Sequence, residues 1–81
     1  MSKELALEKI RLVKSKRNED YIQSVMIEIE DFVNLQESFS YQELMNFIQT
    51  KYSNKLGGIY MYINKALDFL KNELKSCRMI N

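Results

Sequence analysis

The fold class is decided by residues 21–33, Tyr21-Ile-Gln-Ser-Val-Met-Ile-Glu-Ile-Glu-Asp-Phe-Val33, in which apolar side chains recur every three or four positions. At about 100° per residue, seven of these side chains fall within an arc of about 140° on a helical wheel. Asn18 precedes the stretch as a candidate N-cap. Glu19 and Asp20 follow it in the first turn, where the helix dipole favours carboxylates. We therefore expect an amphipathic helix over residues 19–36.

A second helix start follows in the motif Ser40-Tyr-Gln-Glu43. This is a capping box, in which the Ser40 side chain accepts a hydrogen bond from the Glu43 amide and the Glu43 side chain reaches back. Phe39 and Leu44 occupy the two positions of a hydrophobic staple around it. The motif predicts a helix over residues 41–52.

The strongest turn signal is Ser53-Asn-Lys-Leu-Gly-Gly58, which holds the only two glycines of a chain without proline. Glycine or asparagine takes the left-handed conformation that ends a helix at little cost. A last helix is expected over residues 58–77. Its main apolar stripe consists of Ile59, Ile63, Ala66, Leu67, Leu70, Leu74 and Cys77.

The first helix, over residues 3–16, has a weaker pattern. Ala6, Ile10 and Val13 form only a narrow apolar face, which predicts a helix that packs loosely. Strand alternation is short throughout, and no linker or repeat is present. The chain is therefore expected to be one all-α domain over residues 1–81, a compact bundle of three or four helices.

Composition excludes several classes of function. The 81 residues include no His and one Cys, so ordinary zinc, haem and iron–sulfur ligand sets and Ser-His or Cys-His catalytic pairs are not available. We expect no enzyme activity, no cofactor and no metal. A single Cys favours a reducing, cytoplasmic compartment. The longest apolar runs are far shorter than the roughly 20 residues that span a bilayer, and no membrane partner is expected.

The net charge of +1 hides a strong segregation. Residues 1–17 sum to +4, residues 18–50 hold seven acidic and no basic residues, and residues 51–81 sum to +4. An antiparallel bundle with an acidic central helix between basic neighbours would explain this pattern. A basic face and an acidic face for two different partners would explain it too. Glu28, Glu30 and Asp31 are expected to be solvated, since they point in different directions on a helix.

One segment carries a resemblance. The run Phe39-Ser-Tyr-Gln-Glu-Leu-Met-Asn-Phe-Ile-Gln-Thr-Lys-Tyr-Ser-Asn-Lys-Leu-Gly-Gly-Ile-Tyr-Met-Tyr-Ile-Asn-Lys-Ala-Leu-Asp-Phe-Leu70 resembles the core of helix-turn-helix and winged-helix DNA-binding domains. In those domains a capped helix leads through a short turn into a recognition helix. The resemblance implies a helix-turn-helix-like unit over residues 40–75. A plain helical hairpin with a Gly-Gly turn is the alternative.

Under this resemblance, the first half of the last helix and the turn before it would face DNA bases and phosphates. Asparagine pairs with adenine, and lysine holds phosphates. The implied nucleic-acid-binding residues are Asn54, Lys55, Tyr60, Tyr62, Asn64 and Lys65.

The last helix is also apolar over almost half of its circumference, more than a small monomer covers. Tyr62, Phe69 and Ile80 on its flank are therefore candidates for a partner interface, homodimeric or with a larger protein. Two hypotheses follow. The first is a small DNA-binding regulator, expected as a dimer. The second is a protein–protein interaction module, such as an accessory subunit, an inhibitor or an immunity-type protein.

Overall fold

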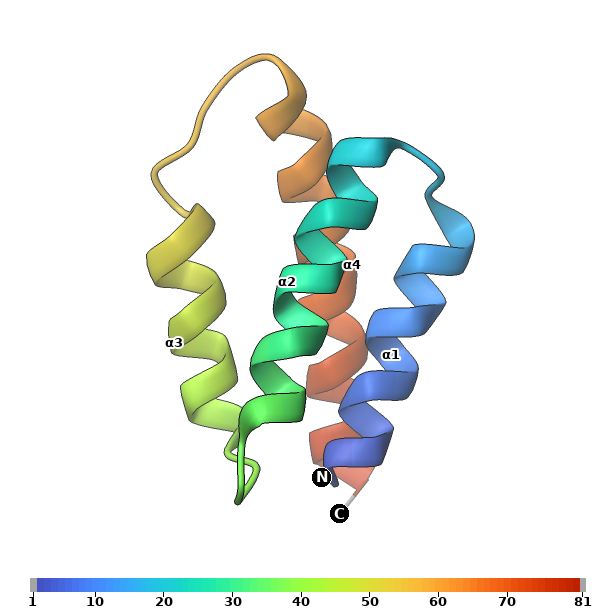
Figure 1. Ribbon diagram of the computed structural model, residues 1–81, viewed down its shortest axis with the longest axis vertical. Coiled ribbons are helices and arrows are strands. Elements are labelled where there is room, and N and C mark those ends of the chain that lie inside the picture. The colour runs from blue at the N-terminus through green and yellow to red at the C-terminus, as the bar shows by residue number, and fades with distance from the viewer. Residues whose placement is uncertain (1, 81) are drawn as a thin grey trace.

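Four helices make up most of the chain: α1 (Lys3–Lys16), α2 (Asp20–Leu35), α3 (Tyr41–Tyr52) and α4 (Ile59–Ile80). The computed structural model describes the backbone of residues 2–80 and the side chains of residues 2–77. Successive helices run in opposite directions along the long axis of the molecule, as Figure 1 shows. The described backbone contains no strand, and the predicted all-α bundle is confirmed with four helices.

Two helix starts show how side chains fix the boundaries. Ser40 Oγ accepts a hydrogen bond of 3.3 Å from the Glu43 amide, as the capping box predicts. The prediction of Asn18 as an N-cap is wrong, because Glu19 is the N-cap of α2 and that helix begins one residue later. The Glu19 carboxylate does not cap the helix itself. It accepts a hydrogen bond of 2.6 Å from Arg17 Nη2 instead.

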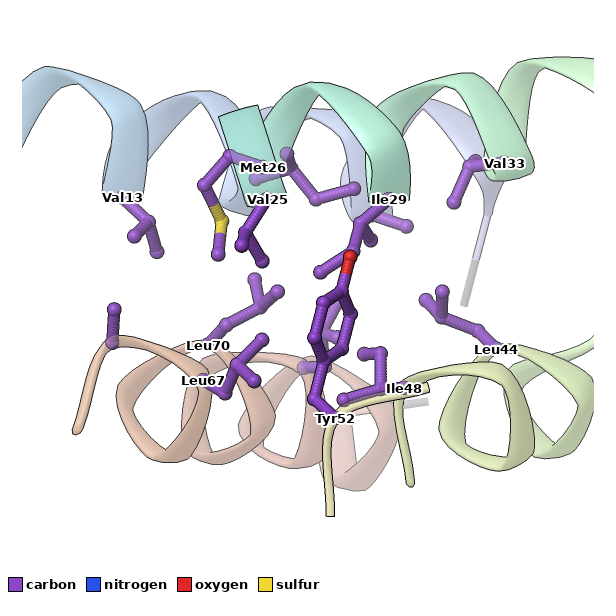
Figure 2. Close-up of a cluster of buried hydrophobic side chains, with 14 of the residues drawn as sticks. Val13, Val25, Met26, Ile29, Val33, Leu44, Ile48, Tyr52, Leu67 and Leu70 are labelled. Carbon is purple, nitrogen blue, oxygen red and sulfur yellow. The ribbon is translucent and has the colours of Figure 1, made fainter. Parts of the chain in front are cut away.

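The core is a continuous apolar layer to which every helix contributes. Figure 2 shows side chains of all four helices converging on it, with Tyr52 of α3 among the aliphatic groups. The largest fully buried side chains are Ile10, Ile22, Met26, Ile29, Leu44, Ile48, Leu70, Leu74, Val13 and Val33. Burial of the apolar face of each helix stabilises such short helices more than their intrinsic helix propensity does.

Helix α1 is an integral part of this core, and the prediction of loose packing is wrong. Ala6 and Ile10 are completely buried, and α1 packs against both α2 and α4. Its narrow face suffices because it lies in the groove between two other helices. Lys3 adds a polar contact, since its Nζ donates to the carbonyl oxygens of Asn34 and Gln36 at the end of α2, at 3.0 and 2.7 Å. A cation at this end is favoured by the helix dipole.

Helix α3 is attached to the bundle mainly through α2. The rings of Phe32 on α2 and Phe47 on α3 are stacked, with centroids 4.2 Å apart and planes 10° from parallel. Leu44, Ile48 and Tyr52 on the same side of α3 are buried. One face of α3 thus closes the core, while its connection to α4 stays exposed.

Ion pairs join acidic α2 to the helices on either side of it. Glu30 contacts Arg11 at 3.0 Å and Lys14 at 3.2 Å on α1, and Glu28 contacts Lys51 at 2.7 Å on α3. The sequence predicts that Glu28 and Glu30 are only solvated. Both instead form ion pairs, because the fold places basic side chains opposite them. These contacts are the ones that an acidic helix between basic neighbours predicts.

Candidate interaction surface

Helix α4 separates two surfaces. Its buried stripe is, with one exception, the predicted one: Ile63, Ala66, Leu67, Leu70, Leu74 and Cys77 are all buried. The exception is Ile59, which stands in the first turn of α4 and is 46% exposed. On either side of the stripe lies a flank, one facing α3 and the other facing α1.

The flank towards α3 holds part of the implied nucleic-acid-binding set. The Asn64 side-chain amide donates a hydrogen bond of 3.3 Å to the Lys55 carbonyl oxygen. Lys55 Nζ lies 5.9 Å from the centroid of the Tyr60 ring. These three residues therefore form one cluster around the start of α4, and exposed Asn54 lies next to it in the sequence.

The flank towards α1 holds the remaining two implied nucleic-acid-binding residues, Tyr62 and Lys65. Lys9 Nζ on α1 lies 3.2 Å from Glu73 Oε1 on α4, and this hydrogen bond raises the pKa of Lys9. About one helical turn nearer the start of α4, Lys16 Nζ lies 5.2 Å from the centroid of the Phe69 ring. Tyr62, seven residues before Phe69, falls on the same side of the helix.

The implied DNA-contacting residues are thus divided between two sides of α4. Asn64 lines a pocket with residues of α3, and Tyr60 lines another with residues of α2 and α3. Lys65 lines the pocket against α1, and helical spacing puts Tyr62 on the same side. Figure 1 shows α3 and α4 running in opposite directions, joined by residues 53–58. In a helix-turn-helix unit the two helices cross steeply through a turn of three or four residues. The geometry favours the hairpin alternative, and DNA binding stays a prediction.

Two of the three predicted interface residues lie on one surface. Tyr62 and Phe69 are 45% and 37% exposed. Ile80 lies outside the described side chains. Spacings of three, four and seven residues bring Met61 and Lys65 onto the same arc of α4. We call this set, Met61, Tyr62, Lys65 and Phe69 of α4 with Lys16 of α1, the α1–α4 surface.

The α1–α4 surface carries uncompensated positive charge. Among the described side chains, Lys16 and Lys65 take part in no ion pair. Arg17 is compensated, since its guanidinium is hydrogen bonded to Glu19 and holds the pKa of that carboxyl below its usual value. Two free ammonium groups therefore stand beside exposed aromatic rings.

A small pocket opens in this surface between the two helices. Its volume is about 230 Å³, and Val13 and Ala66 are the buried, apolar residues in its wall. Phe69 completes the apolar wall, and three basic residues lie around it: Lys16, Arg17 and Lys65. The pocket can receive an apolar group whose neighbours are negatively charged.

A wider groove of about 580 Å³ lies between α2 and α3, around the stacked rings of Phe32 and Phe47. Its charged residues are Glu43 and Lys51, of opposite sign, and Lys51 is already paired with Glu28. This groove therefore offers no net charge by which to select a partner, and the α1–α4 surface is the better-defined candidate.

From the sequence, Tyr62 and Phe69 are predicted to belong to a partner interface and Lys65 to a nucleic-acid-binding set, whereas Lys16 is in neither set. Lys16 belongs to the basic segment 1–17, yet no sequence signal separates it from Lys14, which the fold pairs with Glu30. Which lysine of α1 stays free depends on the register of α1 against α2 and α4.

Within the part of the chain described, no group of three or more His, Cys, Asp and Glu side chains is arranged to hold a metal ion. None of its helices is both long and apolar enough to cross a membrane. Comparison with protein-family models, with curated proteins and with solved structures gives no match.

Proposed function

We propose that this chain is a non-enzymatic protein-docking module that binds a larger protein through the α1–α4 surface. One observation carries the proposal: exposed apolar side chains of α4 adjoin two lysines without acidic partners. Aromatic residues and methionine are enriched at the centres of protein interfaces, where they provide most of the binding energy. Tyr62, Phe69 and Met61 supply such a centre, and Lys16 and Lys65 supply its charged border.

The experiment compares partner capture by matched variants of the full chain. The tagged protein, the double variant Tyr62→Ala/Phe69→Ala and the control Ile27→Ala are incubated with extract of cells that express it. Ile27 is 45% exposed on α2, outside the α1–α4 surface, so the control removes a similar apolar side chain elsewhere. We expect a stoichiometric partner with the wild type and the control and its loss with the double variant. A partner retained by the double variant would contradict this surface assignment.

A small DNA-binding regulator is the second candidate. It is favoured by the position of two segments with basic residues: the end of α1 and the connection between α3 and α4 lie at the same end of the molecule in Figure 1. The first segment contains Lys16 and the second contains Lys55. Fluorescence anisotropy with mixed-sequence duplex DNA at increasing salt tests it. Binding that weakens steeply with salt and is lost in Lys55→Glu/Lys65→Glu would favour the regulator over the docking module. No binding at low salt would exclude it. Light scattering on the same samples reports whether a second copy of the chain is the partner.

A further inference from the structure

The pocket between α1 and α4 restricts the chemistry of what binds there. Its volume of about 230 Å³ lies below the roughly 300–1,000 Å³ typical of sites for whole small-molecule ligands. It therefore has room for a single side chain. Val13 is 1% and Ala66 2% exposed, so the group that enters meets buried apolar carbon.

The charges at the mouth come from both helices. Lys16 stands at the end of α1 and Lys65 stands on α4, and both line the pocket. The contact with the Phe69 ring holds the Lys16 ammonium at the pocket, 5.2 Å from the ring centroid. Arg17, already bound to Glu19, adds little free charge. An occupant that carries negative charges next to an apolar group complements this arrangement.

We infer that the pocket receives one apolar side chain from an acidic segment of the partner protein, with carboxylates next to that side chain meeting Lys16 and Lys65. The inference rests on the docking function proposed above and specifies the partner's chemistry. A phosphate or a nucleic-acid backbone would satisfy the lysines but leave the apolar wall of the pocket uncovered. A basic or neutral segment would leave both ammonium groups without a partner.

The test uses three synthetic peptides and amide chemical-shift titration of the isotope-labelled full chain. The first is the acetylated peptide Glu-Asp-Glu-Phe-Glu-Asp-Glu. The second replaces its Phe by Ser, and the third replaces its acidic residues by Lys. We expect saturable shifts with the first peptide, centred on Val13, Lys16, Lys65, Ala66 and Phe69. Affinity should fall by roughly tenfold or more with the Ser peptide, and the Lys peptide should not bind.

Charge reversal supplies the matched variants. Lys16→Glu and Lys65→Glu should each weaken binding of the acidic peptide by roughly tenfold, because each places a carboxylate against the peptide's own. Lys75→Glu is the control, since Lys75 is an exposed lysine of α4 that does not line the pocket. Lys65→Arg should retain binding. Circular dichroism of each variant verifies that the bundle is folded.

Several results would overturn the inference. These are equal binding of the Phe and Ser peptides, binding of the Lys peptide, shifts centred elsewhere, and no shifts at millimolar acidic peptide. Binding to vesicles of anionic phospholipid that is lost in Lys16→Glu and Lys65→Glu would replace the acidic segment by a membrane surface. Capture of a protein partner combined with failure of the acidic peptide would refute this inference alone. Absence of any partner would refute the docking function itself.

Discussion

The Tyr52 hydroxyl on α3 donates a hydrogen bond of 3.2 Å to Glu28 Oε1 on α2. The other oxygen of the same carboxylate lies 2.7 Å from Lys51 Nζ. Glu28 therefore binds two consecutive residues of α3. Because α3 is attached mainly through α2, this polar contact and the Phe32–Phe47 stack add to its buried apolar face in holding α3 against the rest of the bundle.

The first prediction concerns alkaline pH. Burial, and next the charge of Glu28, raise the pKa of Tyr52 above its usual value of 10.0. The unfolded chain then loses the Tyr52 proton at a lower pH than the folded chain does. The stability that the neutral phenol contributes is fully present below about pH 10 and is lost as the pH rises further.

Urea unfolding at increasing pH measures this effect. The free energy of unfolding of the wild type should fall above about pH 10. That of the Tyr52→Phe variant should fall less steeply. Tyr62→Phe, which changes an exposed tyrosine of α4, is the control and should follow the wild type. Equal slopes for Tyr52→Phe and the wild type would mean that Tyr52 is not protected from ionisation in the fold.

The second prediction concerns acidic pH. The hydrogen bond from Lys51 and then that from Tyr52 lower the pKa of Glu28 below its usual value of 4.5. The stabilisation by this carboxylate is therefore present above about pH 4.5 and is lost as the pH falls through the folded-state pKa. Glu28→Gln should lower the free energy of unfolding at neutral pH. On acidification, the variant should lose less of this free energy than the wild type does.

The measurement is the urea midpoint at neutral pH and at about pH 3, well below the usual glutamate pKa. Asp31→Asn is the matched control, because Asp31 is an exposed carboxylate on the same helix. We expect Asp31→Asn to keep the full acid dependence. If Glu28→Gln keeps it too, the Glu28–Lys51 contact is not formed in solution.

The fold was predictable wherever a local signal determines it. The phase of apolar residues in 21–33 and the N-cap at Ser40 each describe short-range geometry, and both predictions are confirmed. The prediction at Asn18 fails by one residue, since Glu19 is the N-cap and its carboxylate binds Arg17 two residues before it. Ile59 has the phase of the buried stripe but is 46% exposed in the first turn of α4. The apolar pattern gives the phase of a helix, and the burial of its first turn depends on the neighbouring helices.

The site was less predictable than the fold. The helical wheel of α4 already separates Tyr60 from Tyr62, but it does not show that Tyr60 faces α3 and Tyr62 lies on the side of α1. The resemblance to DNA-binding domains assigned both tyrosines to one binding set, because both lie in the first half of the last helix. The free charge of Lys16 depends on which acidic side chains the fold places near it, and that is a property of the whole bundle.

The third prediction tests the packing of α1. Ile10 is completely buried between α2 and α4, and Ile10→Ala should lower the free energy of unfolding by about 2–5 kcal/mol. Ile27→Ala, at an exposed position of α2, should change it by about 0.5 kcal/mol or less. Urea unfolding followed by circular dichroism compares the two. A similarly small effect at both positions would mean that α1 is only loosely associated with the core.

The fourth prediction concerns the connection between α3 and α4. Gly57 and Gly58 have φ angles of 77° and 51°, in the left-handed region that residues with a Cβ atom adopt only at a cost. No atom lies within 4 Å of the Cβ position at either glycine, so a substitution there strains the backbone without causing a clash. Gly57→Ala should therefore lower the free energy of unfolding by about 1–2 kcal/mol.

Gly57→Asn separates backbone strain from other effects, because asparagine tolerates the left-handed conformation better than alanine does. In thermal unfolding, the melting temperature of Gly57→Asn should lie between that of Gly57→Ala and that of the wild type. Since α4 begins at Ile59, directly after these glycines, strain here should also displace its first turn and weaken partner capture through Tyr62. If Gly57→Ala is as stable as the wild type and retains capture, the left-handed turn is not needed to position the start of α4.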